Sequence, residues 1–290
     1  MLGVIIAVKA KALSEDWGHS VWMLQRTIES ILAADSGDIR ICVVCHEVPE
    51  LPRDFRVGAL TANLPVPPRC YVEMCLDKVF KISAGIKYAT ESSWNHVMLI
   101  DCDDLVSRSA MMDAVQIGGD GWYPSAFYSH AYGSRFVRKT HLAYPDTISS
   151  IVLRTEFLSF QEPPFGGKWF SMLAEEPEYC KALNARENAV CTLIAAGHMN
   201  YLSLLESEGH KLRPFSEPSH IVINHPHSLS HEEVDTSNVC SLRAKLGLIR
   251  RRSQVLAGVR LLTPSLRRDF SVPSSAQIPS RYKLGTVFER

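Results

Sequence analysis

The chain has 290 residues, a formal net charge of zero at pH 7, 46% hydrophobic residues and 21% charged residues. This composition is typical of an ordinary globular protein, and it excludes a disordered chain or one that binds nucleic acid through its overall charge. The length suits one large α/β domain with an appendage. The charge is uneven, because from Cys240 onward eleven basic residues accompany two acidic ones.

The cysteines and the apolar segments indicate the cellular compartment in which the protein is found. Eight cysteines are scattered without the paired spacing of a disulfide framework. Cys42 and Cys45 form a CxxC pair inside an apolar strand-like run, where positions three apart face opposite sides of a sheet, so a shared zinc ion is disfavoured. The apolar run 2–8 is too short for a signal peptide, and no later stretch is long enough to span a membrane. We therefore expect a cytoplasmic protein.

Strand-like and helix-like patterns alternate in the first 100 residues. A continuous β-branched run predicts a first buried strand, and Ser20 is the predicted N-cap of the helix that follows it. Further along, a proline-rich stretch over 48–68 indicates a long irregular connection. The predicted strands are 2–8, 39–45, 71–74 and 96–100, and the predicted helices are 20–32 and 77–90. This order is typical of a largely parallel sheet with helices on its faces, in which ligands bind at the carboxyl ends of strands.

The pattern is looser after residue 100. Ser109 is the predicted cap of a helix through Ile117, and the aromatic residues around 122–132 indicate short strands in which most aromatic side chains belong to the core. The remaining predicted elements are a strand at 151–153, a helix at 185–197 that ends at a glycine, and a late strand at 221–223.

The strongest chemical signal is the sequence Asp101-Cys102-Asp103-Asp104, directly after the predicted strand 96–100. Neighbouring carboxylates repel one another unless a cation neutralises them, which favours a metal site. In an extended segment Asp101 and Asp103 project to the same side, so this pair can reach an ion and substrate phosphates while Asp104 braces the loop. Hard oxygen ligands suit Mn²⁺ or Mg²⁺. The alternative is that the acids only cap the next helix.

On these motifs the chain resembles the GT-A glycosyltransferases, in particular the large inverting family numbered two. That resemblance rests on a helix carrying Lys78, Lys81 and Gly85, followed by a strand that ends in Asp101-Cys102-Asp103. It implies a Rossmann-like α/β fold with a mixed, mainly parallel sheet flanked by helices. It also implies that Lys78, Lys81, Asp101 and Asp103 bind the diphosphate of a nucleotide-sugar donor, with Asp103 at the metal.

Farther along, the resemblance continues with weaker motifs. A Gly166-Gly167 loop implies a donor contact at Gly167, and the acidic opening of the predicted helix 185–197 implies Glu187 as the catalytic base. Asn188 stands where that family has an aspartate, so Glu162, Glu175 and Glu176 remain alternative bases. A histidine after a late strand implies His225 as a further metal ligand, with His227 as the competing candidate.

These parts together imply sugar transfer from a nucleotide-diphosphate sugar to an acceptor hydroxyl, with inversion of configuration. The predicted organisation is a GT-A-like catalytic domain over 1–230, with a nucleotide-binding half at 1–112 and an acceptor half at 113–230. A basic helical or irregular extension follows at 231–290. The acceptor is expected to be a glycan or a lipid-linked molecule, and nucleic acid is not an expected partner. The tail either contacts an anionic membrane or packs as a helix over 241–262.

Three other functions stay open. A HAD-like phosphohydrolase also carries Asp-x-Asp after a strand, although Leu105 departs from its motif. A nucleotidyltransferase also uses paired carboxylates, but no phosphate-binding loop rich in glycine and basic residues follows the run 2–8. A catalytically silent GT-A-fold subunit is the third, and Asn188 is the residue that favours it.

Overall fold

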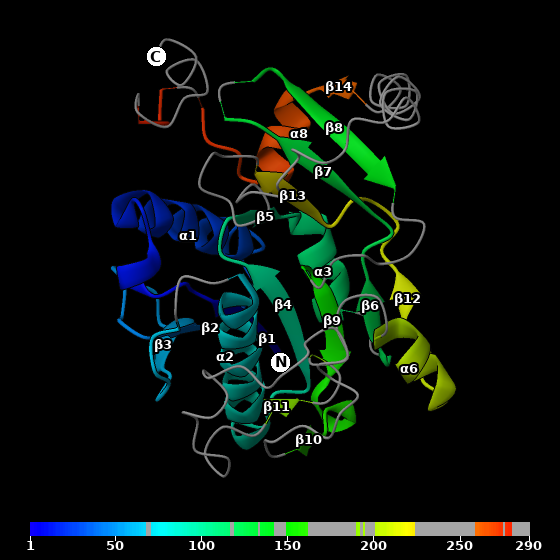
Figure 1. Ribbon diagram of the computed structural model, residues 1–290. Coiled ribbons are helices and arrows are strands. Elements are labelled where there is room, and N and C mark those ends of the chain that lie inside the picture. Colours follow the sequence, from blue (N-terminus) through cyan, green and yellow to red (C-terminus); the bar gives the residue numbers. More distant parts are fainter. Residues whose placement is uncertain are drawn as a thin grey trace, which may run out of the picture.

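The computed structural model describes residues 1–67, 71–116, 119–132, 134–141, 149–161, 190–191, 194, 201–223, 259–274 and 276–279. Its centre is a seven-stranded sheet in the order β12-β6-β9-β4-β1-β2-β3 (Figure 1). The strands, in that order, are Arg213–Pro214, Gly121–Tyr123, Ile151–Arg154, His96–Asp101, Leu2–Ala7, Ile39–Cys45 and Val57–Thr61. Only β9 runs against its neighbours. The predicted mainly parallel α/β sheet is therefore confirmed.

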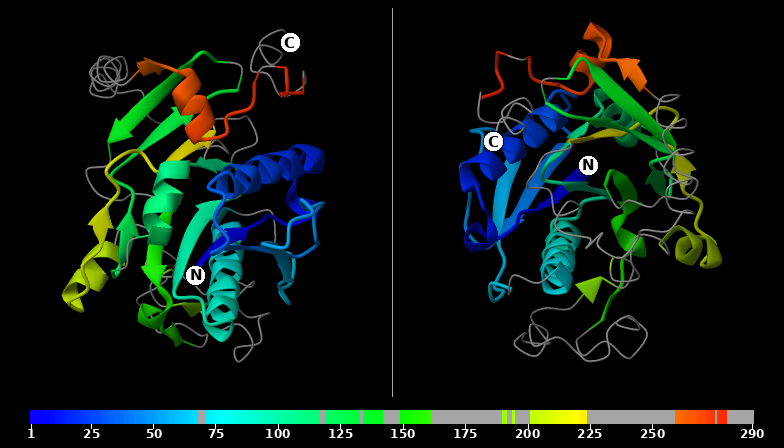
Figure 2. Two further views of the ribbon diagram at one scale, coloured as in Figure 1. Left: turned by 180° about the vertical axis from the view of Figure 1, so that it is seen from behind. Right: turned by 45° about the horizontal axis from the view of Figure 1, so that its top comes forward.

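Helices cover both faces of this sheet. Alternate side chains of β1 divide between two cores: Leu2, Val4 and Ile6 pack with helices α1 (Trp17–Leu32) and α3 (Arg108–Gln116). Ile5 points the other way and packs with α2 (Tyr71–Glu91). Figure 1 shows α2 in front of the sheet, and in the left view of Figure 2, seen from behind, α1 and α3 lie on the near side of the sheet. Cys42 and Cys45 belong to opposite cores, as their spacing predicts.

A second, five-stranded sheet lies beyond the carboxyl end of β4, at the top of Figure 1, in the order β14-β8-β7-β13-β5. These strands are Val259–Leu261, Phe136–His141, Ala126–His130, His220–Ile223 and Asp104–Val106. Helix α8 (Pro264–Asp269) and the chain after it pack on one face, with Phe270 and Leu262 in the shared core. One sheet thus takes strands from all three predicted segments, whose boundaries stay predictions.

The remaining described elements are short. They are η1 (Lys11–Leu13), η2 (Thr155–Phe157), the antiparallel pair β10 (Phe160–Gln161) and β11 (Val190–Cys191), and α6 (Tyr201–Ser207). None of the described helices is long and apolar enough to cross a membrane. The aromatic residues Trp122, Tyr128 and Tyr132 are buried, which confirms their assignment to the core.

Several predictions of local structure are wrong. Asp16, not Ser20, caps α1, because its carboxylate accepts a hydrogen bond from the backbone N–H of His19. Residues 71–74 form the first turn of α2 rather than a strand. The third parallel strand is β3, inside the stretch that we expected to be irregular. Ser107, not Ser109, accepts a hydrogen bond from the N–H of Ala110 at the start of α3.

Two predicted helices are wrong at part of the residues that the structure describes. Val190–Cys191 pairs with Phe160–Gln161 as β11, so the predicted helix 185–197 does not include these two residues, although Ile194 is helical. Within the basic tail, Val259–Leu261 forms an edge strand paired with β8, which excludes a helix reaching residue 262. In both places backbone pairing with a distant strand satisfies the peptide groups instead of a helix.

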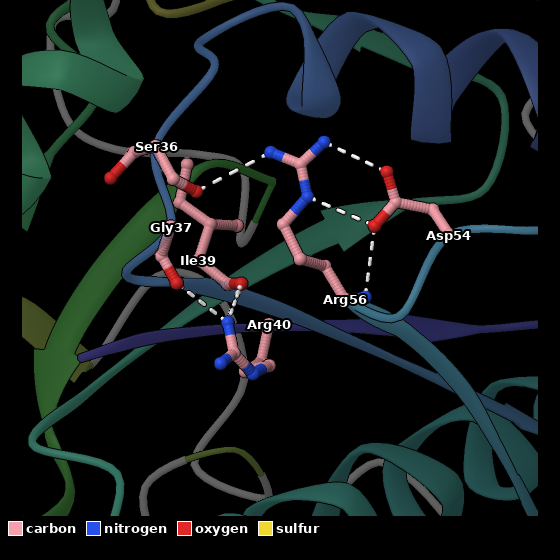
Figure 3. A network of polar contacts seen from close by, with 6 residues as sticks. All are labelled: Ser36, Gly37, Ile39, Arg40, Asp54 and Arg56. Carbon is pink, nitrogen blue, oxygen red and sulfur yellow. Dashed lines mark hydrogen bonds and ion pairs between the residues drawn. The ribbon is translucent and has the colours of Figure 1, made fainter.

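The amino ends of β2 and β3 are joined by an arginine network (Figure 3). The guanidinium of Arg56 binds both carboxylate oxygens of Asp54 at 2.8 and 3.0 Å, and it also reaches the carbonyl oxygen of Ser36. Hydrogen bonds from Arg56 lower the pKa of Asp54 to about 2. Arg40 donates to the carbonyl oxygen of Gly37 at 2.7 Å. This network stabilises the start of edge strand β3 at the amino end of the sheet, which is opposite the end where residues 101–104 lie.

Gly85 lets α2 approach the sheet closely. A Cβ atom there would lie 2.6 Å from Cγ2 of Ile5 and 3.1 Å from Cγ2 of Val44. We expect Gly85→Ala to lower the free energy of unfolding by roughly 1–2 kcal/mol in urea titrations, because overpacking outweighs the gain in helix propensity. At Gly58 a Cβ would meet nothing closer than 4.0 Å, so Gly58→Ala should change the free energy of unfolding by less than about 0.5 kcal/mol. Equal effects at both positions would contradict the close approach.

Candidate active site

The acidic cluster lies where the strand order of the main sheet reverses. From β1 the chain proceeds to β2 and β3 on one side, and β4 then pairs with β1 on the other side. Ala7 at the end of β1 is in register with Asp101 at the end of β4. In open α/β sheets, ligands bind outside the carboxyl ends of the strands at such a reversal. We refer to residues 101–104 as the acidic turn.

An ion pair joins α2 to the acidic turn. The ammonium of Lys78 lies 2.5 Å from Oδ1 of Asp101, and each side chain is about one third exposed, at 33% and 34%. Burial lowers the pKa of Lys78, but attraction to the Asp101 carboxylate, a hydrogen bond to it and the charge of Asp103 outweigh burial and raise the pKa. Lys78 is therefore positively charged and paired with Asp101, and part of its side chain is exposed to solvent.

The acidic turn is held from both sides. The hydroxyl of Ser149 donates to Oδ2 of Asp104 at 2.6 Å and accepts from the backbone N–H of Asp101 at 3.3 Å. From α1, the hydroxyl of Thr27 donates to the carbonyl oxygen of Cys102 at 3.0 Å. Burial and the charges of Asp103 and Asp101 raise the pKa of Asp104 well above its ordinary value. Asp104 thus faces inward, while Asp101 and Asp103 are only half-buried.

A second polar network lies beside the first, and it is buried. The ammonium of Lys81 lies 2.6 Å from Oδ2 of Asp77 and donates to the carbonyl oxygen of Val8 at 2.8 Å. Nε2 of His46 lies 2.9 Å from Oδ1 of the same carboxylate. Burial raises the pKa of Asp77, but hydrogen bonding from His46 and the charge of Lys81 outweigh it and lower that pKa. The network joins α2 to the chain at the carboxyl ends of β1 and β2.

The position of Lys81 does not favour the donor contact that the sequence predicts. Its side chain is 1% exposed, with the ammonium occupied by Asp77 and Val8. Lys78, three residues earlier, is the lysine of α2 that reaches the acidic turn. Lys81 is instead placed to hold α2 against the ends of β1 and β2.

Sequence reasoning missed a buried histidine beneath the acidic turn. His220 is 0% exposed, and its Nδ1 lies 2.8 Å from Oγ of Ser150 and 3.2 Å from Oγ of Ser219. Its ring stacks on Phe127 at a centroid distance of 5.4 Å. Burial lowers the pKa of His220 to about 4, against an opposing effect of the Asp101 charge. Nothing in the sequence around residue 220 distinguishes this histidine from the other ten.

His220 makes stability depend on pH. An unfolded histidine titrates near about 6.5, so between that value and about 4 the unfolded chain binds a proton that the folded one does not. The free energy of unfolding should therefore fall by about 3 kcal/mol between pH 7 and pH 4 on account of this residue. His220→Asn, whose amide can replace Nδ1 but does not titrate, should lose much of that pH dependence in urea titrations. A variant with the full wild-type dependence would contradict a buried neutral His220.

The other predicted site residues, Gly167, Glu187 and His225, lie outside the described residues. The structure does describe strand β13, which comes shortly before His225 in the sequence. Val222 on β13 is in register with Asp104 of the acidic turn, and the strand ends one residue later, at Ile223. Glu187 precedes β11, whose strand structure departs from the helix that the resemblance implies at that point.

The acidic turn offers two carboxylates to a metal ion. Within the described part of the chain, no group of three or more His, Cys, Asp or Glu side chains is arranged to hold a metal ion. Asp104 is turned inward to Ser149, which leaves the half-buried Asp101 and Asp103 on the open side. One or two carboxylates suffice for Mg²⁺ or a similar ion when substrate phosphates and water supply the other ligands. The residues therefore fit an ion that binds together with a phosphorylated ligand.

Comparisons with known proteins identify no family. No protein-family model matches the sequence, and neither does any curated protein. A solved structure from Desulfovibrio desulfuricans G20, described as a candidate nucleotide-diphospho-sugar transferase, is 9% identical, with a TM-score of 0.34 over 88% of this chain and 96% of that one. An active-site mutant of LgtC is 14% identical, with a TM-score of 0.28 over 42% of this chain and 45% of that one. Similarity this low carries no argument about function, which has to come from the site.

Proposed function

We propose that the protein is a GT-A-like glycosyltransferase that binds the diphosphate of a nucleotide-sugar donor at the acidic turn. The observation that carries the proposal is the Lys78–Asp101 ion pair at the reversal point of the sheet, next to the half-buried Asp103. A cation at this edge can move from a carboxylate to a phosphate without leaving the site, because both are oxyanions. The buried Lys81 network holds α2, and with it Lys78, in place.

A divalent cation is part of this proposal. Asp103 would hold Mn²⁺ or Mg²⁺ together with the donor phosphates, Asp101 would share in this contact, and His225 is the proposed further ligand. When bound, the ion would stabilise the negative charge that develops on the departing diphosphate. Lys78 would add its own positive charge on the other side of the same phosphates. Asp104 and Ser149 keep the acidic turn in shape and need not touch the donor.

Transfer also requires a base for the acceptor hydroxyl, and Glu187 is the proposed one, with inversion as the outcome of a single displacement. Asn188 and the strand at Val190–Cys191 both depart from the resembled pattern, and they favour the alternative of a subunit that binds donor without transferring sugar. The proposed acceptor is a glycan or a lipid-linked molecule. The basic C-terminal tail is a proposed contact with an anionic membrane.

Release of nucleoside diphosphate tests this function. Purified protein would be incubated with UDP-, GDP- and dTDP-sugars, with and without Mn²⁺, and the released nucleoside diphosphate measured over hours without acceptor. A transferase should release it slowly from one donor class, and only with the ion. A silent subunit would bind the donor without release. Release of inorganic phosphate from simple phosphate esters, with no nucleotide preference, would instead indicate a phosphohydrolase.

A further inference from the structure

The acidic turn is also a link between the two sheets. Strand β4 of the main sheet ends at Asp101, and β5 of the second sheet begins at Asp104, so only Cys102 and Asp103 separate them. Figure 1 shows β5 and β13 beyond the end of β4. Because the turn is this short, a shift of one sheet against the other would change the positions of its carboxylates. The shape of the site therefore depends on what holds the two sheets together beside the turn.

Two pairs of neighbouring residues, one pair from each sheet, meet beside the turn. Ser149 and Ser150 directly precede β9 of the main sheet. Ser219 and His220 lie at the start of β13 in the second sheet. The hydroxyl oxygen of Ser150 lies 2.6 Å from that of Ser219 and 2.8 Å from Nδ1 of His220. All four residues are at most 1% exposed, and we call them the serine–histidine cluster.

The half of the cluster that belongs to the second sheet is held by that sheet. The carbonyl oxygen of Ser219 accepts a hydrogen bond from the backbone N–H of Ser107 at 2.8 Å. His220 is in register with Val106 at the end of β5, and its ring stacks on Phe127. The cluster therefore offers the main sheet hydrogen-bonding atoms whose positions are set by the second sheet.

Ser150 has a backbone conformation that serine rarely adopts. Its φ of 62° lies in the left-handed region, which is unfavourable for residues with a Cβ atom. Such a conformation persists where the surroundings impose it. Here the backbone N–H of Ser150 donates to the carbonyl oxygen of Leu99 at 2.6 Å, while its hydroxyl reaches the second sheet. The hydroxyl contacts with Ser219 and His220 therefore help to keep Ser150 in this conformation.

Ser149 connects the cluster to the acidic turn. Its position follows from the backbone conformation of Ser150, the next residue. Its hydroxyl donates to Oδ2 of Asp104 at 2.6 Å and accepts from the backbone N–H of Asp101 at 3.3 Å. One serine thus contacts both ends of the turn. If Ser150 left the left-handed region, the hydroxyl of Ser149 would move away from these two partners.

We propose that Ser150, Ser219 and His220 are positioning residues for the acidic turn. They hold Ser149, which holds both ends of the turn and so the carboxylates that a ligand would meet. Partners that orient ligating groups without touching the ligand typically change metal affinity by about ten- to a hundredfold when they are lost. That the carboxylates hold an ion and a nucleotide-sugar donor rests on the proposed function. The effect of the cluster on the shape of the turn does not.

Amide hydrogen exchange at Asp101, followed by NMR on the full chain without ligand, tests the positioning. The N–H of Asp101 donates to Ser149, so its protection reports whether the turn keeps its shape. Ser150→Ala and His220→Leu should each raise its exchange rate about fivefold, the factor that corresponds to one hydrogen bond. His220→Asn should keep most of the protection, because its amide oxygen can take the place of Nδ1. Leucine has the same branching but no acceptor.

Ser125→Ala is the matched control. The hydroxyl of Ser125 donates to the carbonyl oxygen of Phe215 at 3.0 Å on another connection between the sheets, from β6 to β7. Strand β9 separates β6 from β4, so this variant should leave the exchange rate of Asp101 unchanged. The amides of the inner strand β2 should stay protected in every variant, which shows that the fold is intact. Ser150→Ala removes a single oxygen and decides the question if His220→Leu does not fold.

Affinity for Mn²⁺ together with UDP, GDP or dTDP, measured by calorimetry, is the second readout. Ser150→Ala and His220→Leu should weaken binding about tenfold, and His220→Asn much less. If the wild type binds none of these nucleotides, the proposed function fails, and the exchange rates alone decide on the cluster. Three results would overturn the positioning role: a wild-type exchange rate of Asp101 in Ser150→Ala, equal loss of protection in His220→Asn and His220→Leu, or the same loss in Ser125→Ala.

Discussion

Replacing Asp103 with asparagine should lower the rate of nucleoside diphosphate release about a thousandfold. The half-buried Asp103 is the acid of the turn whose side chain would meet both the ion and the donor phosphates, and asparagine keeps its size while removing its charge. Loss of one such preorganised electrostatic contact typically costs two to three orders of magnitude in rate. Because the side chain is not fully buried, the free energy of unfolding should change by less than about 1 kcal/mol.

The control for this variant is Asp38→Asn. Asp38 is exposed and lies just before β2, at the amino end of the sheet, so the same chemical change there should leave the release rate unaltered. A release rate in Asp103→Asn within a few fold of the wild type would contradict the role assigned to Asp103. A large loss of unfolding free energy would mean instead that Asp103 is a structural residue.

Replacing Lys81 with methionine should destabilise the fold by roughly 3–5 kcal/mol, because it leaves the carboxylate of Asp77 buried without its cation. Methionine has a similar length, so the loss reports the charge and the hydrogen bond to Val8 rather than a cavity. Urea titrations monitored by circular dichroism would measure it. Donor binding should weaken in parallel, since α2 also carries Lys78.

Two variants separate this effect from a general loss of charge on α2. Lys87, on the same helix, is exposed, so Lys87→Met should change the free energy of unfolding by less than about 0.5 kcal/mol. Combining Lys81→Met with Asp77→Asn removes the unpaired charge and should recover a large part of the loss. If the double variant is as unstable as Lys81→Met alone, the buried charge is not the cause.

The sequence predicts the inner sheet well because its strands are buried on both faces. Strands β1, β2 and β4 each contain an unbroken apolar run, and no helical period competes with that pattern. Strand β3 was missed because it is an edge strand with mostly exposed side chains, in a stretch rich in proline. The four residues 71–74 were too few to separate a strand from the first turn of a helix.

The sequence predicted one part of the site, the acidic turn, because that part is next to a buried strand. Burial of Lys81 could not be predicted, because it depends on Val8 and His46, which are far away in the sequence. The one local signal was Asp77, four residues earlier on the same helix, whose spacing favours an ion pair with Lys81. His220 and Ser150 meet only through the packing of two sheets, and no spacing rule brings residues 70 positions apart together.

The proposed function requires that the acidic turn and Lys78 bind a nucleoside diphosphate. We would test this claim with a thermal-shift screen against UDP-, GDP-, CMP- and dTDP-nucleotides, each with and without Mn²⁺, on the wild type, Asp103→Asn and Lys78→Met. Binding to the native state should raise stability, by about 2.7 kcal/mol at a hundredfold excess over the Kd. We predict a shift with one base class, dependent on Mn²⁺ and lost in both variants. A shift that persists in both variants, or none with any nucleotide, would contradict the claim.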